Sequence, residues 1–121
     1  MNNWILIGAS SCALCVLIGA FGAHGLKNLL NEYAKNIYQT ANIYHFFHSI
    51  GLILNGLLAK NFLELSFNFS GYLFIAGIIL FSFSLYILAI TDIKILGAIT
   101  PIGGICFIAG WMYIAFQIYN N

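Results

Sequence analysis

The placement of charge is the feature that most restricts this chain, because its seven charged side chains fall in three short clusters. The clusters are Lys27 with Glu32 and Lys35, Lys60 with Glu64, and Asp92 with Lys94. A helix rises about 1.5 Å per residue and the hydrocarbon core of a bilayer is about 30 Å thick, so roughly 20 apolar residues are needed for each crossing. The clusters leave four charge-free segments of that length. The sequence therefore predicts four membrane-spanning helices.

The composition agrees with a hydrocarbon environment. Hydrophobic residues make up 62% of the chain and charged residues only 6%, whereas soluble domains contain roughly 25% charged residues. Residues 1–121 have room for a single domain. The net charge is +1 and there is no arginine, so no basic surface is available to bind a nucleic acid. We expect membrane lipids around the chain, with a homo-oligomer or another membrane protein as its possible partner and no nucleic acid.

The predicted fold class is all-α, an integral membrane bundle of four transmembrane helices over residues 4–23, 43–59, 71–90 and 95–116. No Lys or Arg precedes Trp4, and the apolar run that follows is longer than that of a signal peptide. We therefore expect residues 4–23 to remain in the protein as its first helix. Apolar residues recur with helical spacing over residues 26–40, which predicts an amphipathic helix at the membrane interface between the first two spans.

The lysines predict an orientation. Lys27, Lys35 and Lys94 fall on one side of a four-span arrangement and Lys60 falls on the other. Loops rich in Lys and Arg tend to stay in the cytoplasm. We therefore expect both chain ends to lie outside the cytoplasm. The membrane is expected to be the inner membrane of a bacterium.

Small residues mark the predicted helix contacts in the first span. Helices in a bilayer associate by close backbone approach, which small side chains permit. Ser11, Cys15, Gly19 and Ala23 recur every four residues, and Gly22 widens the same face. We interpret this face as a packing surface.

The fourth span contains the only proline of the chain. Pro101 cannot donate a helical hydrogen bond, so it predicts a kink or break near residues 95–97, with the freed carbonyl satisfied by Thr100. Gly103 and Gly104 are expected to be packing positions. A hinge or a substrate notch at this place is the functional alternative.

The three histidines are the main candidates for chemistry. His24 follows the first span, while His45 and His48 share a face of the second. One interpretation is structural, with the rings bonded to backbone carbonyls, to Glu32, to Gln39 or to water. The alternatives are a metal or haem site made by the three rings, or a site that handles protons.

Other chemistry is poorly represented in the spans. No Asp, Glu or Lys lies in the middle of a predicted span, which argues against an ion-coupled transporter or a proton pump. No nucleophile, base and orienting group can be assembled from the sequence. Asn55, seven residues after His48, is expected to be a hydrogen-bonding clasp between helices.

Three segments carry a family resemblance. They are GAFGAHGL at residues 19–26, YHFFH at residues 44–48, and GAITPIGG at residues 97–104 followed by Gly110 and Trp111. In order and spacing they resemble the YgdD/YwdK-like family of small multi-pass membrane proteins, the family of domain of unknown function 423, which has eukaryotic transmembrane relatives.

The resemblance implies one candidate site and no established activity. It groups His24, Tyr44, His45 and His48 with Thr100 of the fourth span. We expect a non-enzymatic membrane protein, structural or interacting with lipids or partners, without a cofactor. The alternative is a protein that binds haem or a transition metal through the three histidines. A third hypothesis is an oligomeric channel or transporter for a small solute, motivated by Pro101 and the glycine-rich fourth span.

Overall fold

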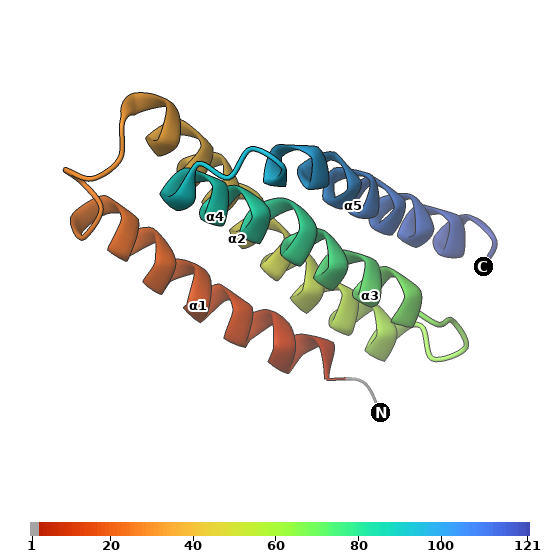
Figure 1. Cartoon of the computed structure of the whole chain (residues 1–121). Helices are drawn as coiled ribbons and strands as arrows, with labels where there is room; N and C mark the ends of the chain where they lie inside the picture. The colour runs from red at the N-terminus through yellow and green to blue at the C-terminus, as the bar shows by residue number, and fades with distance from the viewer. Residues whose placement is uncertain (1–2) are drawn as a thin grey trace.

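The computed structural model describes residues 3–121, which form an all-helical bundle. Its elements are α1 (Trp4–His24), α2 (Glu32–Asn61), α3 (Asn68–Gly77), the π-helix η1 (Ile78–Phe83), α4 (Ser84–Thr91) and α5 (Leu96–Tyr119). The elements α3, η1 and α4 follow one another directly and form one continuous rod. Figure 1 shows the rods side by side, with the start of α1 and the end of α5 at the same end of the bundle. The predicted fold class, an all-α bundle, is confirmed.

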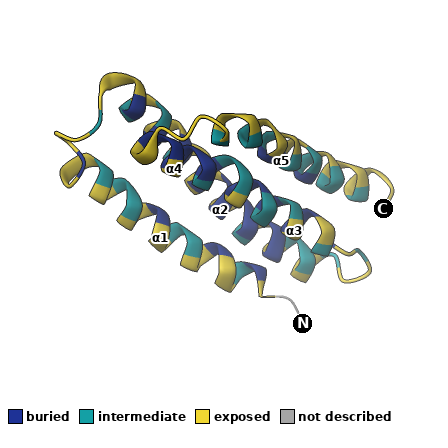
Figure 2. Cartoon of the chain, in the orientation of Figure 1, coloured by how far each residue is buried: buried dark blue, intermediate teal, exposed yellow. Residues whose placement is uncertain are grey.

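Three of the rods are long and apolar enough to cross a membrane, namely Trp4–His24, Asn68–Thr91 and Leu96–Tyr119. Figure 2 shows exposed positions along α1 and α5, and buried positions concentrated on α2 and α4. The exposed positions carry large apolar side chains, such as Leu17 with 68% and Met112 with 64% of their area accessible. Continuous apolar surface of this kind is typical of helices that face lipid.

The segment between the first two spans differs from the prediction. An amphipathic helix over residues 26–40 was expected at the membrane interface, between the first span and a second span at residues 43–59. Instead residues 25–31 form turns, and α2 begins at Glu32 and continues for 30 residues without a break. Asn31 decides this boundary, because its Oδ1 accepts a hydrogen bond from the backbone N–H of Ala34 at 2.8 Å and caps the new helix. The amphipathic pattern belongs to the turns and to the first part of α2.

Helix α2 lies at the centre of the bundle and contacts α1, α3, η1 and α4. Around its first half, Tyr38 and Ala41 pack with Tyr86 and Leu88 of α4. Its second half belongs to a separate core cluster, which consists of Trp4, Leu52, Phe74, Ile78 and Phe107. The polar side chains in the middle of α2 therefore lie inside protein.

Gly19 and Gly22 of the small-residue face of α1 lie against α2, whereas Ala23 of the same face is exposed. A Cβ atom added to Gly19 would lie 2.7 Å from Oδ1 of Asn42, and one added to Gly22 would overlap the Tyr38 ring. The absence of side chains at these two positions lets α1 approach α2 closely. The Tyr38 hydroxyl uses this proximity to donate to the Ile18 carbonyl at 2.6 Å.

A kink or break was predicted near residues 95–97 of the fourth span, and α5 shows no break at Pro101. Helix α5 begins at Leu96 and continues through Pro101, which lies in its second turn. The Thr100 hydroxyl donates to the carbonyl of Leu96 at 3.0 Å, and not to the Gly97 carbonyl that proline leaves free. The preceding turn is made by Asp92, which adopts a left-handed conformation with φ of 58°. Asp tolerates this conformation better than most residues.

The two neighbouring glycines of α5 make different contacts. A Cβ atom at Gly103 would overlap backbone atoms of Leu80 and Phe81 in η1, and backbone cannot move aside cheaply. A Cβ atom at Gly104 would lie 3.8 Å from the Phe81 ring, an ordinary contact. Gly103 is therefore a packing position, whereas Gly104 is open.

This contrast gives a matched pair of variants. We expect Gly103→Ala to destabilise the protein by about 1–3 kcal/mol, because α5 must move away from η1. Gly104→Ala should leave stability unchanged or raise it by up to about 1 kcal/mol through helix propensity. Thermal unfolding in detergent, followed by circular dichroism, measures both. Equal melting temperatures for the two variants would contradict the packing shown here.

Candidate functional site

The central part of α2 carries a row of buried polar side chains. His45, Ser49 and Asn55 have no accessible area, and His48 has 3%. Polar groups away from water are costly unless they are hydrogen-bonded. Their partners come from α1, α3, α4 and α5, so α2 is connected to every other rod of the bundle.

His45 is held from two sides. Its Nε2 lies 3.1 Å from the Ser11 hydroxyl of α1, and its Nδ1 lies 2.9 Å from the Tyr86 hydroxyl of α4. The Ser11 hydroxyl also lies 2.5 Å from the hydroxyl of Ser49, which bonds the His45 carbonyl at 2.7 Å. The ring of His45 therefore fixes the relative position of three helices.

The number of hydrogens fixes the direction of each bond. Ser49 has one hydroxyl hydrogen and uses it on the His45 carbonyl, so Ser11 must donate to Ser49. Ser11 then has no hydrogen left for the ring, and it accepts from the N–H at Nε2 of His45. The Nδ1 atom is left as an acceptor and receives the hydroxyl hydrogen of Tyr86. His45 is accordingly a neutral ring with its proton on Nε2.

Asn42 extends this cluster toward one end of the bundle. Its side-chain amide donates to the Tyr86 hydroxyl and to the Cys15 carbonyl, both at 3.0 Å. In return the Cys15 thiol donates to the backbone carbonyl of Asn42 at 3.3 Å. The polar chain thus runs from Cys15 and Asn42 through Tyr86 and His45 to the two serines.

His48 has the opposite arrangement of its ring hydrogen. Its Nδ1 lies 2.9 Å from the Tyr44 carbonyl, which can only accept, so Nδ1 carries the hydrogen. Its Nε2 accepts from the indole N–H of Trp111 in α5 at 2.9 Å, since indole can only donate. The ring also stacks on Phe107 with a centroid separation of 3.5 Å. His48 therefore joins α2 to α5.

Asn55 is the predicted clasp between helices, and the structure confirms it. Its amide donates to the Phe67 carbonyl at 2.9 Å and its Oδ1 accepts from the Ser70 hydroxyl at 2.6 Å. The clasp joins α2 to the start of α3 across residues 62–67.

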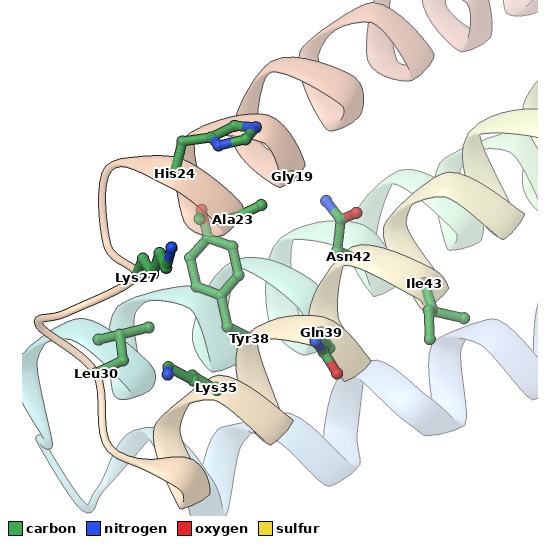
Figure 3. A pocket seen from close by; sticks show the side chains of 11 residues that line it. Gly19, Ala23, His24, Lys27, Leu30, Lys35, Tyr38, Gln39, Asn42 and Ile43 are labelled. Atoms are coloured by element: carbon green, nitrogen blue, oxygen red, sulfur yellow. The ribbon is translucent and has the colours of Figure 1, made fainter.

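A pocket of about 560 Å³ opens at the end of the bundle where α1, residues 25–31 and α2 meet. Figure 3 shows the Tyr38 ring in its middle, with the side chains of Lys27 and Lys35 on the side of the connecting turns. His24 lies at the end of α1, and Asn42 lies deeper along α2. Asn42 is the residue that the pocket shares with the buried polar cluster.

The candidate residues taken from the sequence lie in three places. His45 and His48 are buried one turn apart on α2, with separate partners. His24 is exposed at the pocket, Tyr44 contributes its backbone carbonyl to His48, and Thr100 bonds within α5. Among residues 3–121 no three His, Cys, Asp or Glu side chains are arranged to hold a metal ion. Both ring nitrogens of His45 and of His48 already have hydrogen-bond partners.

Several partners were not identified from the sequence. Tyr86 and Asn42 complete the His45 cluster, and Trp111 completes the contact of His48. A signal existed for Asn42, which precedes His45 by three residues and so shares its helix face. Tyr86 and Trp111 gave the weaker signal of a polar atom on an aromatic side chain within an apolar span.

The donor and acceptor roles in these hydrogen bonds determine which proton transfers the cluster permits. Ser11, His45 and Tyr86 resemble a nucleophile, a base and an orienting group in their spacing. However, the Ser11 hydrogen points to Ser49, and the facing ring atom Nε2 already carries a proton. In this arrangement Nε2 of His45 donates to Ser11 and does not accept its proton, and the cluster connects α1, α2 and α4.

The two buried histidines should therefore show opposite tautomers. In the ¹⁵N spectrum of labelled protein at neutral pH, we expect the hydrogen of His45 on Nε2 and that of His48 on Nδ1. The variant Trp111→Phe removes the donor to His48, so it should shift the signals of His48 and leave those of His45 in place. The same tautomer at both rings would contradict the assigned bond directions.

Comparison with known proteins identifies the family. Residues 18–104 match the family described as "Protein of unknown function (DUF423)". The UPF0382 membrane protein YwdK of Bacillus subtilis is 44% identical over 115 residues, which cover 94% of each chain. A UPF0382 membrane protein of Staphylococcus haemolyticus is 42% identical over 120 residues, covering 99% of this chain and 98% of the relative. No solved structure matches the chain significantly. This chain therefore belongs to the DUF423 family of membrane proteins, which the sequence resemblance had indicated.

Proposed function

We propose that this chain is a four-span membrane protein that holds a membrane lipid and catalyses no reaction of its own. The observation that carries the proposal is the pocket between α1 and α2, which lies at one end of an apolar bundle and is bordered by lysines. The buried polar cluster has the supporting role of fixing the helices that form the pocket walls.

In this proposal α2 also crosses the membrane, as the second of four spans in chain order. Its 30 residues extend about 45 Å at about 1.5 Å per residue, which exceeds the thickness of the hydrocarbon core. Its hydropathy is lowered by residues such as His45, His48 and Asn55, but these are buried among other helices and do not meet lipid. A central helix can be less apolar than the helices that surround it.

The distribution of lysines supports the proposed orientation. Lys27, Lys35 and Lys94 lie in or near the connections at the pocket end, whereas Lys60 lies at the other end. By the positive-inside tendency the pocket end faces the cytoplasm and both chain ends lie outside it. The relatives are bacterial and are named membrane proteins, which is consistent with an inner-membrane location.

The alternatives receive less support from the geometry. Haem or a transition metal would have to displace the hydrogen bonds of His45 and His48, and among the described residues His24 forms no hydrogen bond with either ring. A channel was motivated by the glycines of α5, but Gly103 is used for contact with η1. No specific observation favours either function.

The crossing of α2 can be tested with single cysteines. Asn28→Cys lies in the first connection, Glu64→Cys in the second, and Asn121→Cys at the chain end. We expect a membrane-impermeant maleimide added to intact spheroplasts to label Glu64→Cys and Asn121→Cys, and to label Asn28→Cys only after lysis. The native Cys12, Cys15 and Cys106 lie within α1 and α5 and give the background. Labelling of the first two connections from the same side would mean that α2 does not cross.

Lipid retention tests the function itself. We expect protein purified in a mild detergent to keep a stoichiometric amount of phospholipid, measured by mass spectrometry of the solvent extract. Ala23→Trp places a large ring in the pocket and should reduce the retained lipid, whereas Ala20→Trp, at an exposed position of the same helix that does not line the pocket, should not. Folded wild-type protein free of lipid would overturn the proposal.

A further inference from the structure

The pocket contains a cationic group without a nearby counter-charge. Lys94 donates to Asp92 at 2.9 Å, and this hydrogen bond raises the pKa of Lys94. Lys35 lies 3.8 Å from Glu32, whose side chain is 88% exposed. Among the described residues Lys27 forms no salt bridge. The pocket end therefore has three lysines and two carboxylates, an excess of positive charge.

The two pocket lysines come from different segments and border the same space. Lys27 belongs to the turns after α1 and Lys35 to the first turns of α2, and both line the pocket together with Gln39. Figure 3 shows both side chains on the same side of the Tyr38 ring. An anion placed between the two side chains could interact with both ammonium groups.

Deeper in the pocket a hydrogen-bond acceptor is unused. Both hydrogens of the Asn42 amide are committed to Cys15 and Tyr86, but its Oδ1 accepts no hydrogen bond from residues 3–121. This oxygen lies against Gly19 in the pocket wall. An occupant that complements the pocket would combine an anion near the lysines with a hydroxyl donor near Asn42.

We propose that the pocket binds the headgroup of an anionic glycerophospholipid, with the phosphate between Lys27 and Lys35 and a glycerol hydroxyl toward Asn42. The inference rests on the proposed function, which it narrows from lipid in general to a phosphoglycerol headgroup. Basic pockets between membrane helices on the cytoplasmic side suit such headgroups. Ile43 lines the same pocket and is 66% exposed, so it gives the acyl chains an apolar surface that a soluble phosphate ester would not use.

The test compares lipids that differ only in their headgroup. Full-length protein in detergent is titrated with phosphatidylglycerol or with phosphatidylcholine of the same acyl chains, and bound lipid is counted by native mass spectrometry. We expect wild-type protein to prefer phosphatidylglycerol by about tenfold or more, given the attraction of two lysines to an anionic headgroup. Equal binding of the two lipids would overturn the inference.

Two double variants with the same net charge locate the site. Lys27→Gln with Lys35→Gln should abolish the preference, whereas Lys60→Gln with Lys94→Gln should retain it, because both pocket lysines remain. Each variant must show the wild-type melting temperature; if the first pair does not fold, Lys27→Gln alone is used and should reduce the preference. Loss of the preference in both pairs would mean that overall charge and not the pocket selects the lipid.

A soluble competitor identifies the source of the phosphate. Glycerol 3-phosphate lacks acyl chains, and it should not displace phosphatidylglycerol at concentrations where the lipid is bound. Displacement at such concentrations would overturn the assignment to a lipid. Retention of phospholipid without a headgroup preference would overturn this inference while leaving the proposed function intact, so the two can fail separately.

Discussion

The hydrogen bonds of the buried face of α2 are the interactions on which the rest of the structure depends. Hydrocarbon offers no hydrogen-bond partner, so a polar helix can cross it only if other helices satisfy its side chains. In this chain α1 supplies Ser11, α4 supplies Tyr86 and α5 supplies Trp111. The position of each outer helix is set by a directional bond to a histidine of α2, in addition to close packing. The central helix can consequently be polar where the surrounding helices are apolar.

The same requirement connects the interior to the pocket. The amide of Asn42 donates to groups on α1 and α4, while its oxygen faces the pocket wall. Tyr38 has a similar double position, since its hydroxyl binds the Ile18 carbonyl and its ring stands in the pocket. The shape of the pocket is therefore determined by the polar cluster, and a change in the cluster would alter the separation of α1 and α2 where a headgroup would bind.

The sequence predicted what depends on local composition and missed what depends on relative helix position. Charge clusters and hydropathy predicted an all-helical bundle with long apolar helices, and small residues predicted a packing face on α1. The boundary at Asn31 was missed because a single capping side chain, and not the periodicity, separates the turns from α2. The partners of His45 lie 34 and 41 residues away along the chain, on two other helices. Their contact depends on how far each helix is rotated about its own axis, which hydrophobic patterns do not specify.

The π-helix η1 has a consequence for that rotation. A π-helical turn accommodates one residue more than an α-helical turn, and one residue corresponds to about 100° of rotation in an α-helix. Tyr86 follows η1 by three residues, so the direction of its hydroxyl reflects this insertion. In a regular helix of the same length Tyr86 would point about 100° away, and its hydroxyl would no longer be directed at Nδ1 of His45. The π-helix η1 thus sets the rotation of α4 about its axis, and this rotation directs the Tyr86 hydroxyl of α4 toward the His45 ring of α2.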